Sequence, residues 1–211
     1  MTEPIRHKKR CLEDYSEVMK HEHSSDNFFR TFIPKPKHIH ISIQDKDEKI
    51  VLVLRQHWIT QLSKLVLLLV AFILVPTILQ FAGFMDALPR QFAHAFNIFL
   101  IVLACGLFTR SFLIWFFNVY VVTDERVIDF DFASMIYHNI SSAKIENIED
   151  VTARSTGPLA AIFDYGTILI QTAGEETEFE FENVPQPAKV TKLINELILE
   201  EEREKLEGRI N

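Results

Sequence analysis

Two pairs of histidines are the clearest candidates for metal chemistry in this chain. His21 and His23 form one His-x-His pair, and His38 and His40 form another. Alternate residues of a strand share a face, so each pair could supply two ligands to a metal ion. Because neither pair is accompanied by a third carboxylate or thiolate ligand in a matching pattern, we expect ordinary exposed histidines and no metal site.

Carboxylates and thiols give no catalytic pattern. Asp129 and Asp131 share one face of a predicted strand, but acid–base catalysis needs a pocket that gives two carboxylates separate environments. Cys11 and Cys105 lie on opposite sides of a membrane-like segment, so neither a disulfide framework nor a thiolate site is expected. The sequence contains no glycine-rich phosphate loop, Gly-x-Ser-x-Gly elbow, His-Glu-x-x-His motif or dinucleotide fingerprint. We therefore expect no enzyme activity, no catalytic residues, no cofactor and no small-molecule substrate.

Apolar residues are concentrated in the middle of the chain. Between residues 65 and 117 the only formally charged side chains are Asp86, Arg90 and Arg110. The runs 65–85 and 97–117 would each form a helix of about 31 Å, which matches a hydrocarbon core of about 30 Å. They predict two transmembrane helices. The alternative is a pair of buried helices in a soluble domain, but the rest of the chain is too polar to surround them.

The short connector 86–96 predicts that the two spans form an antiparallel hairpin. Basic residues are more frequent before the first span than in the connector, which contains only Arg90. The positive-inside rule therefore places both termini in the cytoplasm. We expect a multi-pass protein of the inner (cytoplasmic) cell membrane.

Five residues are expected to anchor these helices at the membrane surface. Trp58, Trp115 and Tyr120 fit an interfacial aromatic belt, and Lys64 belongs to the basic flank. Arg110 lies within the second run, about 10 Å from its cytoplasmic end, and its long side chain can snorkel to the surface. We favour this role over a transport or gating charge, because two helices with one arginine make a poor conduction path.

After residue 118 the pattern changes from helical to short and alternating. Predicted strands and short apolar segments cover 118–123, 126–132, 134–140, 143–154, 158–163, 167–173 and 175–184. In the last segment, Phe179 and Phe181 point to one side, whereas Glu178, Glu180 and Glu182 point to the other. This alternation predicts a half-buried strand with a solvated acidic face.

The end of the chain predicts one amphipathic helix. Its apolar stripe extends to about Leu206 and contains Val190, Leu193, Ile194, Leu197 and Ile198. Six or seven strands followed by one helix predict a small β-barrel or β-sandwich capped by that helix, over residues 118–207.

Three phrases of this region and one before the first span resemble a known family. They are YVVTDERV at 120–127, ISSAKIENIEDV at 140–151, FDYGTILIQTAG at 163–174 and EKIVLVLRQHW at 48–58. They are similar to the bacterial PH-like (YdbS-like) membrane protein family, over roughly residues 47–199. The resemblance implies a PH-like barrel of two orthogonal sheets, closed by a C-terminal helix and tethered to the inner membrane. The expected fold class is an α+β membrane protein with a two-helix transmembrane hairpin (62–117), followed by a PH-like β-barrel or sandwich capped by a C-terminal α-helix.

The charge of the predicted domain argues against binding phosphate groups. Residues 118–185 contain thirteen acids and only three bases, which are Arg126, Lys144 and Arg154. Capture of a lipid phosphate or of nucleic acid needs clustered Arg and Lys side chains. We therefore expect no nucleic-acid partner, and the charges serve to keep the domain soluble.

The first 37 residues form an N-terminal arm of opposite character. Residues 11–20 can form a short amphipathic helix using Leu12, Tyr15, Val18 and Met19, and 26–37 mix aromatic with basic residues. Such a segment suits the surface of an anionic membrane, with a disordered tail as the alternative. Residues 38–61 predict a hairpin that leads into the membrane and could pair with an edge of the barrel. Opposite net charges suggest that the arm docks on the acidic barrel face.

Two functions are consistent with this organisation. The first is a membrane-anchored PH-like interaction module that scaffolds a protein partner or further copies of itself at the inner membrane face. The alternative is a lipid-responsive sensor that uses the basic and aromatic arm. The expected partners are membrane lipids and a protein whose identity the sequence does not give.

Overall fold

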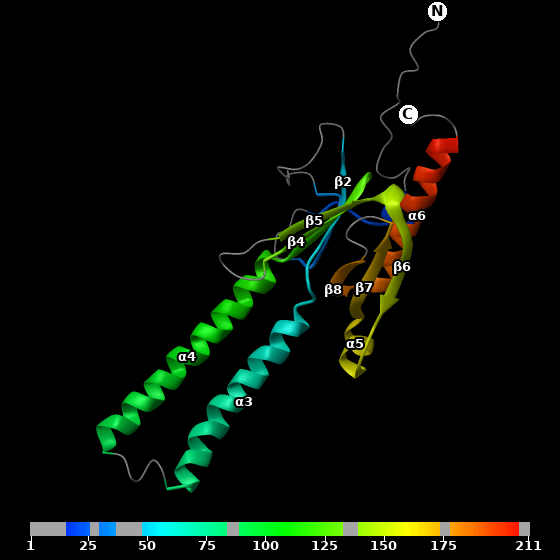
Figure 1. The fold of residues 1–211 in the computed structure, drawn as a ribbon. Helices are drawn as coiled ribbons and strands as arrows, with labels where there is room; N and C mark the ends of the chain where they lie inside the picture. Colours follow the sequence, from blue (N-terminus) through cyan, green and yellow to red (C-terminus); the bar gives the residue numbers. More distant parts are fainter. Residues whose placement is uncertain are drawn as a thin grey trace, which may run out of the picture.

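The computed structural model of the 211-residue chain describes residues 16–25, 30–36, 48–83, 89–132, 139–173 and 178–206. Figure 1 shows two long helices leading away from a domain of two sheets, with a third long helix packed on the domain. His38 and His40, the first fifteen residues and the connector residues 84–88 lie outside the described residues. In chain order the elements are α2 (Glu17–Lys20), β1 (Phe32–Pro34), β2 (Ile50–Leu54), α3 (Ile59–Phe81), α4 (Arg90–Phe117), β3 (Val119–Thr123), β4 (Arg126–Asp131), β5 (Asn139–Lys144), the 3-10 helix η1 (Ile145–Asn147), β6 (Ile148–Arg154), α5 (Pro158–Phe163), β7 (Tyr165–Thr172), β8 (Glu178–Pro185) and α6 (Pro187–Leu206).

The strands form two separate antiparallel sheets. One has the order β1-β2-β3-β4-β5 and the other β6-β7-β8. The described strands therefore do not close a barrel, which corrects the closed form of the expected fold. β5 covers 139–144 rather than the expected 134–140, and its register is set by pairs such as Phe130 with Ile140. Residues 133–138 lie outside the described part of the chain.

β2 joins the first sheet although 60 or so residues and both long helices separate it from β3. It pairs antiparallel with β1 on one side and β3 on the other, so it is an inner strand rather than an addition at an edge. All five of its residues are buried, as a continuous apolar run predicts for a strand covered on both faces. The folded unit therefore includes residues on both sides of the helical pair.

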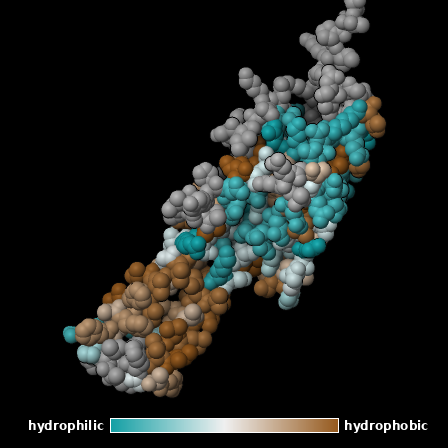
Figure 2. Space-filling view, viewed as in Figure 1, coloured by the Kyte–Doolittle hydropathy of each residue, from teal (hydrophilic) through white to brown (hydrophobic). Residues whose placement is uncertain are grey.

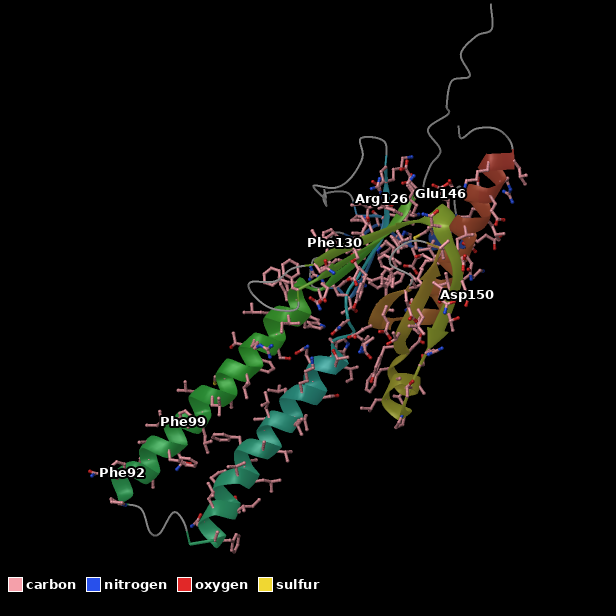
Figure 3. The ribbon with its side chains drawn as sticks, viewed as in Figure 1. Phe92, Phe99, Arg126, Phe130, Glu146 and Asp150 are labelled. Carbon is pink, nitrogen blue, oxygen red and sulfur yellow. The ribbon has the colours of Figure 1, made fainter. Side chains whose placement is uncertain are left out.

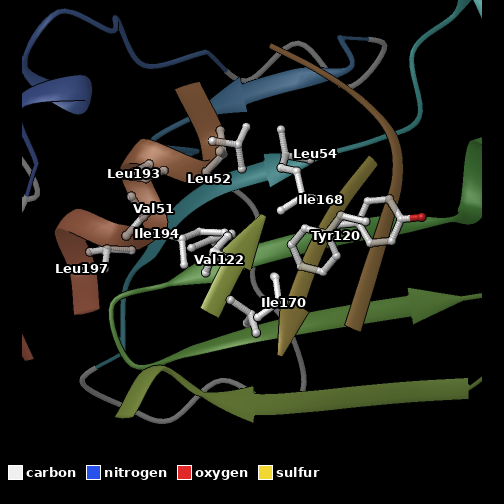
Figure 4. Close-up of a cluster of buried hydrophobic side chains, with 14 of the residues drawn as sticks. Val51, Leu52, Leu54, Tyr120, Val122, Ile168, Ile170, Leu193, Ile194 and Leu197 are labelled. Carbon is white, nitrogen blue, oxygen red and sulfur yellow. The ribbon is translucent and has the colours of Figure 1, made fainter. Parts of the chain in front are cut away.

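The main core lies between the two sheets and α6. Its fully buried side chains include Phe181 and, labelled in Figure 4, Leu52, Val122, Ile168 and Leu193. The stripe expected on the last helix is confirmed from Val190 to Leu197, which are buried with Leu193 and Ile194, but its expected end at Leu206 is wrong, since Leu206 is 89% exposed. The alternation expected for β8 is confirmed too, with both phenylalanines inside.

α2 completes this core from the N-terminal arm. Val18 and Met19 are buried, and Met19 is fully inaccessible to solvent. The carboxylate of Glu196 on α6 accepts hydrogen bonds from the Ser16 hydroxyl and, at 3.4 Å, from the Val18 amide. The arm was expected to dock on the acidic barrel face. Instead α2 packs on α6, because burial of Val18 and Met19 gives an apolar contact that charge attraction does not supply, and β1 of the same arm pairs with β2 in the first sheet.

α3 and α4 are antiparallel neighbours whose apolar side chains point outward. α3 has a mean hydropathy of 2.5 over its most apolar window and α4 has 2.1. Both helices are long and apolar enough to cross a membrane. Figure 2 shows their hydrophobic surface as one continuous region, in contrast with the largely hydrophilic domain. α3 begins six residues before the predicted 65–85 span, and Pro76 lies inside it without ending it.

Candidate functional site

An acidic cleft of about 300 Å³ opens where the second sheet meets the inner face of the first. Four strands supply its walls. It is lined by Asn118, Tyr120, Asp129, Asp131, Ser141, Glu178, Phe179, Glu180 and Glu182. The lining residues, all within the described part of the chain, include five carboxylates and no basic side chain.

Strand alternation brings the first wall together. Tyr120, Asp129 and Ser141 stand opposite one another across β3, β4 and β5, so their side chains share the inner face of the sheet. The next alternate residue of β4 on that face is Asp131, which accepts a hydrogen bond from the Asn118 amide at 3.3 Å. The inner face is therefore apolar near Val122 and becomes acidic toward the end of α4.

The second wall is β8, an edge strand of the smaller sheet. Its three alternate glutamates are exposed and follow the cleft, whereas Phe181 packs inward with its ring stacked on Tyr120 at 4.6 Å. The Tyr120 hydroxyl accepts a hydrogen bond from the Glu182 amide at 3.1 Å. Burial raises the pKa of Tyr120, and the carboxylates of Asp129 and Glu182 raise it further, so the hydroxyl stays neutral. The two walls are thus joined at Tyr120.

This arrangement favours a positively charged group. Carboxylates on both walls attract an ammonium or guanidinium group and repel phosphate. The volume is at the lower end of the range for ligand sites and suits one or two basic side chains of a peptide. Asp129 and Asp131, which the sequence placed together on a strand without a pocket, do line one.

The helical pair is fastened to the domain by residues 55–58, directly after β2. Arg55 is buried with its guanidinium 4.8 Å from the centre of the Phe116 ring on α4. The Trp115 indole donates a hydrogen bond to the Gln56 carbonyl at 2.8 Å. The His57 amide donates to the Asn183 carbonyl at 2.7 Å, and its ring stacks on Tyr165 at 5.4 Å. These contacts tie both helices and both sheets to one point.

The structure places the five predicted membrane anchors in three different environments. Trp58 is half exposed at the start of α3, and Lys64 and Arg110 are exposed on the two helices. Trp115 is buried in the junction just described. Tyr120 lies in the domain core with 4% of its surface exposed, where the structure gives it protein contacts instead of an open membrane-facing position. No sequence pattern assigned Arg55, Gln56 and His57 to a junction, although they form a polar interruption between an apolar strand and an apolar helix.

Of the two histidine pairs, the structure describes only His21 and His23, because His38 and His40 lie outside the described residues. His21 and His23 are exposed beyond α2. Among the described residues, no group of three His, Cys, Asp or Glu side chains is placed to hold a metal ion.

Most of the chain matches a protein family. A model described as Bacterial PH domain matches residues 50–198, from β2 to α6. The chain belongs to the bacterial PH domain family. This confirms the resemblance drawn from residues 48–58 and 120–174. No curated protein and no solved structure matches the chain. The matched region of this bacterial PH domain protein includes α3 and α4, so the helical pair lies within the family region rather than outside it.

Proposed function

We propose that this protein is a membrane-anchored interaction module whose acidic cleft binds a basic segment of a partner protein. In this proposal α3 and α4 cross the cytoplasmic membrane, and the PH-like domain stands at its cytoplasmic face. The convergence of Asp129 and Asp131 with the β8 glutamates carries the proposal, because it gives the domain a recognition surface of defined charge.

Membrane anchoring is supported by the surface of the two helices. Ile73 on α3 and Val102 on α4 are 64% and 65% exposed. Phe92 and Phe99 lie along α4 away from the sheets and are 56% and 59% exposed (Figure 3). Apolar surface of this extent is stable in lipid and costly in water. Basic residues before α3 support a cytoplasmic domain.

A partner peptide is favoured over an anionic lipid headgroup by the lining of the cleft. A headgroup phosphate would face carboxylates on both walls, whereas a Lys or Arg side chain would form charge-assisted hydrogen bonds with them. β8 is an edge strand, so a peptide could also add backbone hydrogen bonds there. Helix α2 of the N-terminal arm packs on α6, which supports an intramolecular role for residues 16–20 over a lipid-sensing one.

The binding test uses the full chain in lipid nanodiscs and a fluorescent tri-lysine peptide as the probe. We expect measurable, salt-sensitive binding that Asp129→Asn/Asp131→Asn weakens at least several-fold. The matched control is Glu149→Gln/Asp150→Asn, which removes the same charge from exposed positions of β6 outside the cleft. Equal weakening by both variants would show that only net charge matters and would refute the cleft as the site.

The anchoring test is separate. The full chain should sediment with membranes and resist extraction at alkaline pH, and a reporter fused after residue 211 should report the cytoplasm. Recovery in the supernatant without detergent would contradict the membrane anchor, whatever the outcome of peptide binding.

A further inference from the structure

Helix α5 presents apolar side chains to solvent at the end of the second sheet. Leu159, Ile162 and Phe163 are 45%, 72% and 38% exposed. Outside α3 and α4, only four other large apolar side chains among the described residues are exposed: Trp58, Ile140, Leu199 and Leu206. Three of these seven side chains therefore lie on one helix of six residues.

The backbone conformation at both ends of α5 defines where this helix begins and ends. Gly157 precedes it with a φ of 95°, Pro158 occupies its first turn, and Asp164 ends it in the left-handed region at φ 48°. Ala160 is 2% exposed and faces the protein. The helix is thus fixed at both ends with Ala160 inside and its large apolar residues outside, the reverse of what a soluble surface favours.

α5 lies beside the beginning of α3. The Phe163 ring meets the Trp58 ring edge-on at 6.3 Å and lies 6.5 Å from the His57 ring. Trp58 directly precedes the first residue of α3. Figure 1 shows α5 at the end of the second sheet, projecting along the helical pair at the level where α3 starts.

Charged residues of the helices indicate the depth of this level. Lys64 lies five residues after Ile59, about 8 Å along α3, and Arg110 lies seven residues before Phe117, about 10 Å along α4. If these side chains reach the headgroups, the first turns of α3 pass through the headgroup region, which is about 5–8 Å deep on each side. α5, beside those turns, lies in the same layer.

We infer that α5 is a third membrane contact, with Leu159, Ile162 and Phe163 inserted at the boundary between headgroups and acyl chains. This inference rests on the proposed membrane anchoring. The occupant is the bilayer because the patch is continuous through Trp58 with the apolar surface of α3. The contact fixes the second sheet to the membrane independently of the first, which α4 enters directly through β3. Both sheets that form the walls of the cleft are then attached to the membrane surface.

The test places single spin labels on the full chain in vesicles of phosphatidylethanolamine and phosphatidylglycerol. Cys11→Ser and Cys105→Ala remove the native thiols, and labels are attached at Ile162→Cys, Ile73→Cys or Leu199→Cys in turn. All three positions are at least 60% exposed, so each label is expected to be tolerated. Collisions with oxygen, which concentrates in lipid, are compared with collisions with a water-soluble nickel complex.

The expected result is an oxygen-to-nickel ratio that is highest at Ile73, intermediate at Ile162 and lowest at Leu199. A ratio at Ile162 equal to that at Leu199, with Ile73 in lipid, would overturn the α5 contact and leave the anchor intact. Low collision rates with both agents at Ile162 would assign the patch to a second copy or another protein and would likewise overturn the inference. An aqueous ratio at Ile73 would refute the anchor itself.

Discussion

The helical pair and the domain core contain the same kinds of side chain but expose them in opposite ways. Ile73 and Val102 on the helices are more than 60% exposed, whereas Ile168 and Val122 in the core are fully buried. The core is covered by two sheets, α6 and α2. α3 and α4 are covered by contact with one another and, in our proposal, by lipid. The contrast shows that apolar composition alone does not define a protein core, because the surrounding solvent decides which surface must be hidden.

The largest difference in the free energy of unfolding should be between alanine variants of one phenylalanine in each region. Phe181→Ala removes a buried ring stacked on Tyr120 and should lower the free energy of unfolding by about 3–5 kcal/mol. Phe99→Ala, on exposed α4, should leave the domain's stability nearly unchanged. Denaturant titration of the detergent-solubilised chain, followed by circular dichroism, measures both. Similar losses in the two variants would contradict the separation of the regions.

A second comparison asks whether the arm belongs to the core. Met19 is fully buried although it precedes the helical pair by about 40 residues, so Met19→Ala should cost about 2–4 kcal/mol. Lys20→Ala, the exposed neighbour on α2, is the matched control and should have little effect. No loss from Met19→Ala would show that α2 does not stabilise the domain in solution.

A third comparison concerns the pH dependence that a partly buried carboxyl group gives the domain. Burial raises the pKa of Asp124 from 3.8 to about 6, although its carboxylate accepts a hydrogen bond from the Lys49 amide at 2.8 Å. The folded state therefore binds this proton more tightly than the unfolded state does. Stability should rise as the pH falls from about 6 to about 4, and this contribution is absent above that range.

Asp124→Asn should remove that rise, which we expect to be on the order of 1–2 kcal/mol after allowing for partial solvent exposure. Asp150→Asn, at an exposed position of β6, is the control and should keep the wild-type profile. Unfolding curves recorded across this pH range give the measurement, and an unchanged slope in Asp124→Asn would count against the assignment.

The smallest loss of stability should come from variants at the junction between the helical pair and the domain. Trp115→Phe keeps an aromatic ring but removes the hydrogen bond to the Gln56 carbonyl, at a cost of about 1 kcal/mol. Trp58→Phe, at a half-exposed position, should change the melting temperature less. If Trp58→Phe is the more damaging of the two, the junction depends on Trp58 packing rather than on this hydrogen bond.

Elements with a strong local pattern could be predicted from the sequence. The apolar runs around residues 65–85 and 97–117 became α3 and α4, and the stripe from Val190 to Leu197 became the buried face of α6. Phe179 and Phe181 alternate with glutamates because side chains of a strand point to opposite faces at every step. In each case a short stretch of the sequence contains the whole hydrophobic pattern.

The candidate site could be predicted only in part. Asp129 and Asp131 were placed on one strand face, and the β8 glutamates on another, but about fifty residues separate the two sets. Their meeting depends on how β8 lies against the first sheet. Tyr120 was expected at a membrane surface because aromatic residues near a span are typical of one, and its ring instead packs on Phe181.

The sequence by itself determined the two apolar helices, the alternating strands, the amphipathic last helix and the acidic charge of the domain, since periodicity and composition are local properties of the chain. Only the tertiary structure decided that β2 and α2 join the domain across the helical pair, that the strands leave an open acidic cleft, and that α5 lies beside α3. These features depend on contacts between residues far apart in the chain, and the free energy of such contacts is set by packing and register rather than by any local pattern.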